Sequence, residues 1–185
     1  AANLSLIDTN AVGAAFDGNG TFTGNIGNAT VTVGDGFTLT TSGSIAASKT
    51  INKAGAGALA VTVASGDAAV DLSSIAGSAL ATITVNGAVT FTGTLDDAIA
   101  TTLANGSTFT TTAAKADGLT ISDGTDTATA NITALHSTLA ADLSNIDANT
   151  VTAAFDGNGT FTGDIGNATV TVGNGNTLTT TAAKA

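Results

Sequence analysis

One long string occurs twice in this chain with a single difference. Residues 14–34 read AAFDGNGTFTGNIGNATVTVG and residues 153–173 read AAFDGNGTFTGDIGNATVTVG, so that only Asn25 and Asp164 differ. The two copies lie near opposite ends of the sequence. Near-identity over such a separation indicates internal duplication, and a duplicated sequence of this kind predicts a repeated structural unit.

Weaker matches place a third copy between the other two. The strings LSLID, LSSIA and LSNID begin at Leu4, Leu72 and Leu143, which are almost evenly spaced. TFTTTAAKA at 108–116 and TLTTTAAKA at 177–185 agree at eight of nine positions. We therefore predict repeat units at 4–71, with a divergent insert at about 42–67, at 72–142, and a partial unit at 143–185. We expect the chain to be a segment of a longer repetitive protein.

The composition limits the kind of core that the repeats can build. The chain contains 37 Thr, 37 Ala and 23 Gly, and it lacks Pro, Cys, Met, Trp and Tyr. Because 43% of its residues are hydrophobic, it is too apolar to remain disordered. Its apolar side chains are small or β-branched apart from Leu and seven Phe. Such residues favour a thin core between closely spaced strands.

The charges exclude several classes of partner. All 14 acidic residues are Asp, against four scattered Lys, which gives a net charge of −10. So few cations cannot form a phosphate-neutralising patch, and we predict neither nucleic acid nor anionic membrane as a partner. No run approaches the ~18 apolar residues of a membrane-spanning helix. The absence of Cys excludes disulfides and thiolate metal sites.

Short alternating runs recur every eight to eleven residues and predict β-strands. Successive side chains of a strand point to opposite faces, so Thr faces outward and the alternate apolar residues face inward. In the first unit the inward set is Phe22, Val31, Val33 and Leu39. Gly, Asn and Asp between the runs, as in DGNG at 17–20, mark tight turns.

Two architectures fit this rhythm: a β-solenoid and a string of tandem β-sandwich domains. The runs of three to five residues are short for a sandwich, where five or six is usual. The intervals from Phe22 to Leu39 and from Phe91 to Phe109 are nearly equal and suit one coil of a solenoid. We predict an all-β, β-solenoid-like repeat protein with short strands and minor helical corners.

Three segments depart from the strand pattern. In residues 94–103 and 134–146, Leu and Ile recur at three to four residues, which predicts either a short helix or an irregular corner packed on the strands. Residues 48–57, SKTINKAGAG, contain two of the four Lys and have no counterpart in the other units. This segment is the most linker-like part of the chain.

Asp and Asn in Gly-rich turns form the candidate metal site. Calcium takes six to eight oxygen ligands, which alternating Asp and Asn side chains can supply. Neither the tandem nonapeptide GGxGxDxUx nor an EF-hand loop is present, so an ordinary turn is the competing interpretation. The calcium candidates are Asp17, Asn19, Asp123, Asp126, Asp156 and Asn158.

No set of residues predicts catalysis, and we expect that the protein is not an enzyme. His136 is the only His, and without Cys or Glu it cannot complete a transition-metal site. Asp96 and Asp97 are adjacent, and neighbouring residues of a helix point apart, so a carboxylate dyad is not expected. A carbohydrate-active β-helix would usually need aromatic platforms, and Trp and Tyr are absent.

Pairs of Thr separated by one residue suggest a second kind of surface. If the coils align, these pairs form flat Thr ladders that resemble those of ice-binding proteins. The alternative is that Thr is simply the polar residue best suited to an exposed strand face. The pairs are Thr21 with Thr23, Thr38 with Thr40, Thr90 with Thr92, Thr108 with Thr110, Thr160 with Thr162, and Thr177 with Thr179.

Two long strings carry a resemblance to a class of proteins. Residues 143–172 (LSNIDANTVTAAFDGNGTFTGDIGNATVTV) and 108–135 (TFTTTAAKADGLTISDGTDTATANITAL) resemble repeats of very long, acidic bacterial adhesins, surface-layer proteins and extracellular filament proteins. The resemblance covers most of the chain outside about 42–67. It implies an extracellular or cell-surface location, assembly into fibres or layers, and often calcium.

The resemblance and the repeats together predict a structural role. We expect a subunit or segment of an extracellular fibre, sheath, surface layer or adhesin, in which the main partner is the protein itself or a neighbouring repeat. Self-association would proceed through exposed strand edges. The alternative is a calcium- or ice-binding repeat module of a large secreted protein.

Overall fold

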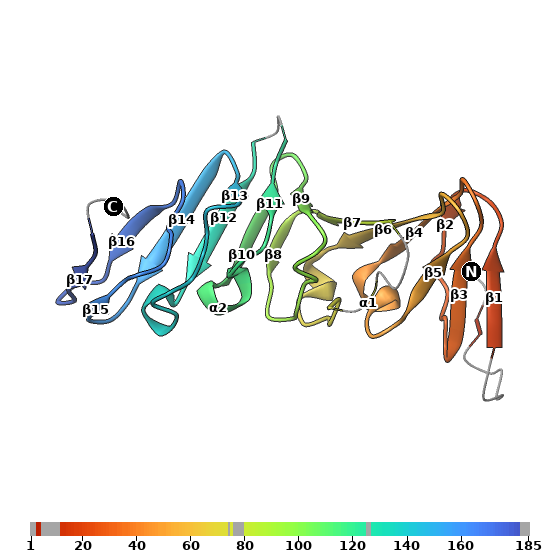
Figure 1. Cartoon of the computed structure of the whole chain (residues 1–185), viewed down its shortest axis with the longest axis horizontal. Coiled ribbons are helices and arrows are strands. Elements are labelled where there is room, and N and C mark those ends of the chain that lie inside the picture. The colour runs from red at the N-terminus through yellow and green to blue at the C-terminus, as the bar shows by residue number, and fades with distance from the viewer. Residues whose placement is uncertain (1–2, 5–11, 74, 76–79, 125–126, 182–185) are drawn as a thin grey trace.

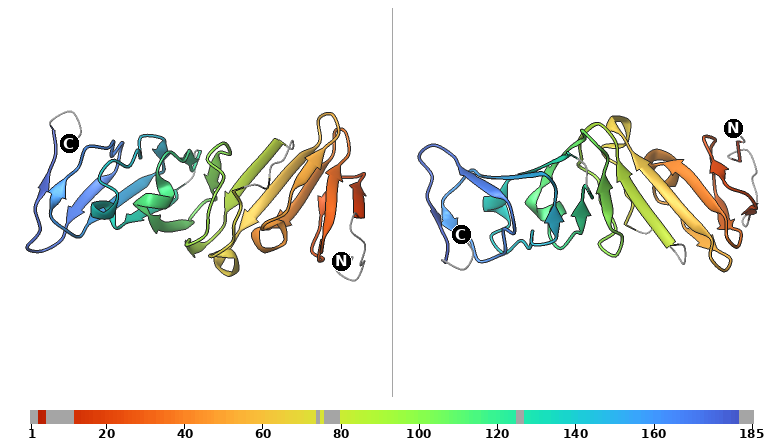
Figure 2. Two further views of the ribbon diagram at one scale, coloured as in Figure 1. Left: turned by 60° about the horizontal axis from the view of Figure 1, so that its bottom comes forward. Right: turned by 90° about the horizontal axis from the view of Figure 1, so that it is seen from above.

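The protein is a β-solenoid of about eight turns, in which every described strand pair is parallel. The computed structural model describes residues 3–4, 12–73, 75, 80–124 and 127–181. The coils stack along one axis into an elongated rod, with the two ends of the chain at opposite ends of the rod (Figures 1 and 2). The predicted all-β solenoid is confirmed, and the alternative of tandem sandwiches is wrong.

Four parallel sheets form the walls of the rod. The first sheet contains β1 (Val12–Phe16), β3 (Ala29–Val33) and β5 (Ile51–Lys53). The second contains β2 (Gly20–Thr21), β4 (Thr38–Ser42), β6 (Ala58–Val63), β7 (Leu80–Val85), β9 (Thr101–Leu103), β11 (Ile121–Ser122) and β13 (Ile146–Asp147). The third contains β8 (Ala88–Thr90), β10 (Thr108–Thr112), β12 (Thr129–Thr133), β14 (Thr150–Phe155) and β16 (Thr169–Val172). The fourth contains β15 (Gly159–Thr160) and β17 (Leu178–Thr179).

Short helical turns form some of the corners. They are α1 (Gly43–Ala46), α2 (Ala113–Ala116) and the 3₁₀ turns η1 (Ser65–Asp67) and η2 (Leu135–Ser137). In the segments with helical Leu and Ile spacing, 94–103 contains an isolated bridge at Thr94 and turns before β9, and 134–146 contains η2, an isolated bridge at Asp142 and further turns before β13. Both are irregular corners, as one of the two predicted alternatives stated.

A strand near the start of each of the two later repeats continues a sheet of the repeat before it. The strand β7 pairs with β6 on one side and with β9 on the other, and β14 pairs in the same way with β12 and β16. These two strands occupy equivalent positions of the middle and last repeats. The following strand, β8 or β15, starts a new sheet. The solenoid therefore keeps one of its two walls and exchanges the other for a new one once per repeat.

The length of one full coil varies along the rod. One of the shortest coils runs from Ala14 to its register partner Val31. The longest coil among the described strand pairs runs from Ile121 to its register partner Ile146. The predicted Phe-to-Phe and Phe-to-Leu coil spacings were wrong in register. The Phe22 N–H donates to the Thr40 carbonyl (2.8 Å), and the Phe91 N–H donates to the Thr110 carbonyl (2.7 Å). Phe22 is therefore in register with Thr41, and Phe91 is in register with Thr111. Each of these Thr residues directly follows the one whose carbonyl accepts the bond.

These in-register threonines are exceptions to the outward orientation of Thr. Thr41 and Thr111 are each only 2% exposed. The Thr41 hydroxyl donates to the Phe22 carbonyl (3.1 Å), and the Thr111 hydroxyl donates to the Phe91 carbonyl (3.0 Å). A buried hydroxyl is tolerated at this position because it finds an acceptor on the adjacent coil.

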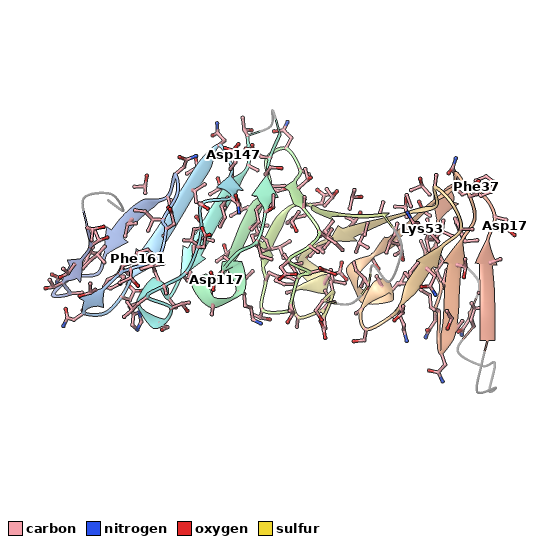
Figure 3. The ribbon with its side chains drawn as sticks, in the orientation of Figure 1. Asp17, Phe37, Lys53, Asp117, Asp147 and Phe161 are labelled. Atoms are coloured by element: carbon pink, nitrogen blue, oxygen red, sulfur yellow. The ribbon has the colours of Figure 1, made fainter. Side chains whose placement is uncertain are left out.

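The core is thin and runs the length of the rod. Val31, Val33 and Leu39 are buried as predicted, whereas Phe22 is half-buried. The rings of Phe91 and Phe109 pack with their centroids 5.8 Å apart. Charged side chains such as Asp117 and Asp147 lie on the outer surface, at opposite edges of the rod (Figure 3).

The prediction of a linker at residues 48–57 was wrong. Ile51 is fully buried in β5 and lies in register with Val31. Gly57 is also buried, and a Cβ at that position would approach the Val33 carbonyl oxygen to 2.6 Å. This coil forms without the Thr-x-Thr pattern. Ile51 fills the core, and Gly57 allows the backbone to pass close to that of the preceding coil.

We expect Gly163→Ala to destabilise the rod. A Cβ on this buried glycine would overlap the Ala141 carbonyl oxygen of the preceding coil. Forcing the two backbones apart should lower the free energy of unfolding by about 1–3 kcal/mol, measured by urea denaturation. Gly66→Ala is the control, because a Cβ there meets no atom within 4 Å. Equal midpoints for the two variants would contradict this packing.

Candidate functional site

The predicted Asp and Asn turns connect adjacent coils. Asn19 Oδ1 accepts a hydrogen bond from the Thr38 N–H (2.7 Å). Asn158, at the same position of the last repeat, accepts one from the Thr177 N–H (2.6 Å). In each case the side chain reaches from its own turn to the start of a strand in the next coil.

Asp123 makes a comparable connection from a buried position. It is 7% exposed, and its Oδ2 atom accepts bonds from the Asn149 N–H (2.6 Å) and the Ala128 N–H (3.2 Å). Three further carboxylates accept a main-chain N–H from a neighbouring coil. We call the whole set the turn clamps: Asn19, Asp35, Asp67, Asp117, Asp123 and Asn158.

The structure therefore gives several calcium candidates a defined role within the fold. Asp17 and Asp156 are exposed and lie in the same turns as the clamps Asn19 and Asn158. Asp126 lies outside the described residues. Among the residues that the structure describes, no three His, Cys, Asp or Glu side chains gather to hold a metal ion. Calcium binding at these turns stays a prediction, and a calcium titration followed by thermal melting tests it, because a ligand of the folded state raises the midpoint.

The only His is a packing residue in this arrangement. His136 is half-buried, and its ring meets the ring of Phe155 edge-on with centroids 6.3 Å apart. Ser137 Oγ lies 3.4 Å from His136 Nε2, but Nδ1 has no hydrogen-bond partner among the described residues. The ring therefore contacts Phe155 and Ser137 in the described part of the chain.

The surface carboxylates are held by local hydrogen bonds. The hydroxyl and N–H of Ser73 both donate to Asp71 (2.7 and 3.0 Å), which lowers the pKa of this exposed carboxyl group. Asp96 accepts the Ala98 N–H (2.9 Å) within its own turn. These contacts stabilise turns and do not bring two carboxylates together.

Outward hydroxyls align into columns on two of the sheets. On the second sheet, Ser42, Thr62, Thr84, Thr102 and Ser122 stand in register. On the third sheet, the column is Thr90, Thr110, Asn131, Thr152 and Thr169, with a second column of Thr108, Thr129 and Thr150 beside it. Thr152 Oγ1 donates to Asn131 Oδ1 (2.8 Å). Of the predicted Thr pairs, Thr108 with Thr110 lies within this array.

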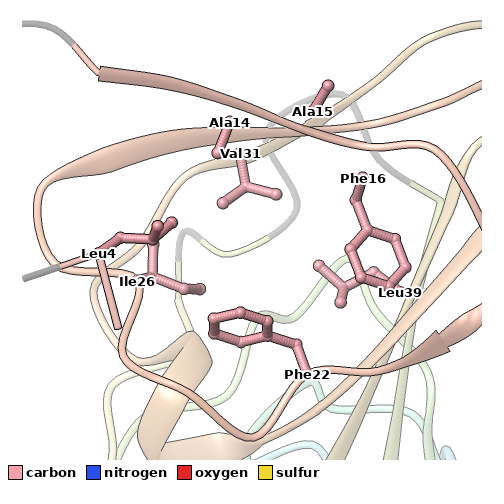
Figure 4. Close-up of a pocket in the computed structure, with 8 residues that line it drawn as sticks. All are labelled: Leu4, Ala14, Ala15, Phe16, Phe22, Ile26, Val31 and Leu39. Carbon is pink, nitrogen blue, oxygen red and sulfur yellow. The ribbon is translucent and has the colours of Figure 1, made fainter. Parts of the chain in front are cut away.

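The N-terminal end of the rod exposes part of the core. An open cavity of about 200 Å³ lies there, and its walls are almost entirely apolar (Figure 4). Phe16 and Phe22 on its walls are half-buried, whereas the equivalent Phe155 and Phe161 are 0% and 1% exposed. The cavity is lined by Leu4, Ala14, Ala15, Phe16, Phe22, Ile26, Val31 and Leu39.

The opposite end also exposes apolar residues. Val172 on β16 is 40% exposed, and Val170 and Leu178 are half-buried. Since β16 and β17 are terminal strands of their sheets, their outer edges have no partner among the described residues. Some apolar side chains near both ends of the described rod are therefore less completely buried than those of the coils between them.

Comparison of the chain with protein-family models, curated proteins and solved structures gave no match. The structure has no helix, within the part that it describes, with both the length and the apolar character needed to cross a membrane. Function is therefore inferred from the geometry of the walls and ends.

We expect Asp123→Ala to destabilise the rod, because it removes the acceptor of two main-chain N–H groups, one of them buried. An unsatisfied buried donor costs about 1–3 kcal/mol, so the urea midpoint should fall. Asp123→Asn should lose less, since both bonds use one oxygen that an amide can supply. The exposed Asp97→Ala is the control. Identical midpoints for Asp123→Ala and Asp97→Ala would refute the clamp.

Proposed function

We propose that this protein is a structural segment of an extracellular bacterial fibre, sheath, surface layer or adhesin that self-associates through strand edges at its ends. The observation that carries the proposal is the contrast between the hydroxyl-covered walls and the partly exposed apolar side chains near both ends of the described rod. Repeat rods are stabilised by contact between neighbouring coils, and uncovered terminal coils reduce solubility. Association at the ends would extend the rod and cover these residues.

The strand geometry supports this mode of association. Parallel strands repeat at about 4.7–4.9 Å, so another coil added to either end would continue the same ladder of main-chain bonds. An exposed strand edge is a template for such pairing. A heterologous contact of this kind, one end against a different end, produces an open filament when its rotation does not close.

The walls are unsuited to the same kind of association. Their outward residues are mostly Thr, Ser and Asn, and the chain carries a net charge of −10. Rods that approach side by side would bring like charges together, which disfavours lateral contact at low salt. The proposal is therefore specific to growth along the axis.

We expect concentration-dependent association of the chain at micromolar concentration in sedimentation velocity. Val172→Lys should weaken it, because it places a charge on an exposed terminal strand, a device by which natural edges avoid pairing. The control is Ala114→Lys, which adds the same charge at an exposed corner away from the ends. A single monomeric species for the unmodified chain would contradict the proposal.

A second candidate function rests on the hydroxyl columns of the third sheet. Neighbouring hydroxyls in these columns stand about 4.8 Å apart across strands and about 6.6 Å apart along a strand, as strand geometry sets. A regular two-dimensional array of this kind is a candidate ice-binding surface. On this alternative, the rod would be an ice-binding repeat module of a large secreted protein.

Thermal hysteresis measurements test the ice-binding alternative. We expect hysteresis with the unmodified chain if the array binds ice, and Thr150→Lys should reduce it, because Thr150 is exposed in the second column of that sheet. Ala114→Lys, at a corner outside the array, should leave it unchanged. No hysteresis in the unmodified chain would eliminate this candidate.

A further inference from the structure

The described rod contains two junctions at which one repeat stacks on the next. In each, the third coil of a repeat (β5 with β6, or β11 with β12) carries a strand of the following repeat, so that β6 pairs with β7 and β12 pairs with β14. Both third coils then end in a helical turn, η1 or η2. We call residues 64–68 the corner of the first junction and residues 135–139 the corner of the second. The two junctions can be compared residue by residue.

A pair of main-chain bonds holds the second junction together. The N–H groups of Thr162 and Gly163 both donate to the Leu139 carbonyl (2.7 and 3.1 Å). One carbonyl of the corner thus accepts two donors from the following repeat. We call this pair of donors the fork of the junction.

The first junction has the same fork. The N–H groups of Thr92 and Gly93 both donate to the Ala68 carbonyl (2.7 and 3.0 Å). Ala68 and Leu139 therefore occupy the same place in their junctions. Because main-chain bonds do not depend on the side chain, the forks alone would accept either repeat on either corner.

The side chains beside the two forks exchange size. In the second junction a Cβ on Gly159 would lie only 3.2 Å from Leu139 Cδ2. In the first, the corner residue is Ala68, and Val89 takes the place of Gly159 directly before the string TFTG. Val89 is 2% exposed, and its strand β8 packs against η1. One junction thus combines a large corner residue with a glycine, and the other combines a small corner residue with a valine.

A second side chain of the larger corner also requires a glycine. A Cβ on Gly157 would come within 2.7 Å of His136 Cδ2. The backbone does not adopt a positive φ at Gly157, so the ring and not the turn conformation is the reason for glycine there. The smaller corner carries Ser65 in place of His136, and Ser65 is exposed.

Mixed pairs would be unfavourable in both directions. A leucine corner against a valine would overlap, and overpacking forces side chains out of their preferred positions. An alanine corner against a glycine would leave a void, which loses packing contacts. The side chains can therefore discriminate between repeats that the forks treat alike.

We propose that the corner of each third coil selects the repeat that follows it, through Ala68 in the first junction and Leu139 in the second. A leucine corner accepts a repeat with glycine directly before TFTG, and an alanine corner accepts a repeat with valine there. The surface is an interface between repeats, and its partner is a repeat of matching size. This selection goes beyond the proposed self-association and does not depend on it.

Selection of this kind protects a chain of similar repeats from stacking in the wrong order. If the last repeat stacked on β6 in place of the middle one, its fork could still form on the Ala68 carbonyl. The pair of Ala68 with Gly159 would then leave a void, which disfavours the skipped arrangement. Misassembly between similar units is a characteristic failure of repeat proteins, and specificity requires that wrong partners be disfavoured.

Hydrogen exchange of the fork amides, measured by NMR on the full chain, tests the proposal at the first junction. We expect Val89→Gly to speed exchange of the Thr92 and Gly93 amides by roughly tenfold, because it leaves a void beside Ala68. In a chain that also carries Ala68→Leu, the same substitution should slow their exchange by roughly threefold, because it relieves an overlap. The lower strand propensity of glycine is the same in both backgrounds and cannot reverse the sign.

The second junction provides the reciprocal test. Gly159→Ala should speed exchange of the Thr162 and Gly163 amides by roughly threefold, because its Cβ would press on Leu139. In the Leu139→Ala background it should leave their exchange unchanged or slow it, since the Cζ atom of Phe155 stays at an ordinary 3.6 Å. The fork of the junction that is not substituted is the internal control and should keep its exchange rates.

The sign of each effect separates selection from ordinary packing. If Val89→Gly speeds exchange equally with and without Ala68→Leu, or Gly159→Ala does so with and without Leu139→Ala, the proposal is wrong. Equal acceleration at both forks would also overturn it, because the junctions would then not act separately. If the variants of one junction do not fold, those of the other junction decide. Since exchange does not measure association, a failure of the proposed self-association would leave this result unaffected.

Discussion

Each coil of this protein depends on the next coil for its main-chain hydrogen bonds and for the cover of its apolar side chains. Parallel ladders join residues that are a full coil apart in sequence, such as Ala14 with Val31 and Ile121 with Ile146. The main-chain N–H groups of such strands therefore find their acceptors on a neighbouring coil and not within their own coil. The same dependence explains the buried hydroxyls of Thr41 and Thr111, which bond to a carbonyl of the adjacent coil. Stability in such a rod is a sum of nearest-neighbour contacts, which makes a terminal coil different from an internal one.

The composition follows from how closely the coils approach. A large side chain at every inward position of so short a coil would leave no room for the opposite wall, and Ala, Val and Thr fill much of this narrow space instead. Glycine is required where a backbone of one coil crosses another, as at Gly93 and Gly163. Asp and Asn in the turns then add bonds between coils without widening them. The low-complexity appearance of the sequence is thus a consequence of thin, repeated packing.

The sequence was sufficient to predict the solenoid class and the inward positions Val31, Val33 and Leu39, because both depend on local alternation. It misled at 48–57, where one buried Ile51 and small residues form a coil without the repeated pattern. The change of walls at β7 could not be predicted, since a strand's two partners are set by long-range register. The clamp of Asn19 on Thr38 was missed for a related reason: an oxygen that binds calcium and one that binds a distant N–H look identical in a turn sequence. An Asx residue repeated at the same turn position was the available signal.

The duplicated string gives an internal comparison of sequence and context. Phe16 and Phe155 occupy the same position of the two copies, but only Phe155 is fully covered. The string therefore does not by itself determine the burial of its residues, and the difference comes from the third coil that precedes Phe155. Each coil of such a repeat has two contact surfaces. One packs against the coil that precedes it, and the other packs against the coil that follows it, as β14 does with β12 and β16. The same residues thus keep apolar surface exposed in one copy and bury it in the other, and covering that surface with a further coil would be favourable.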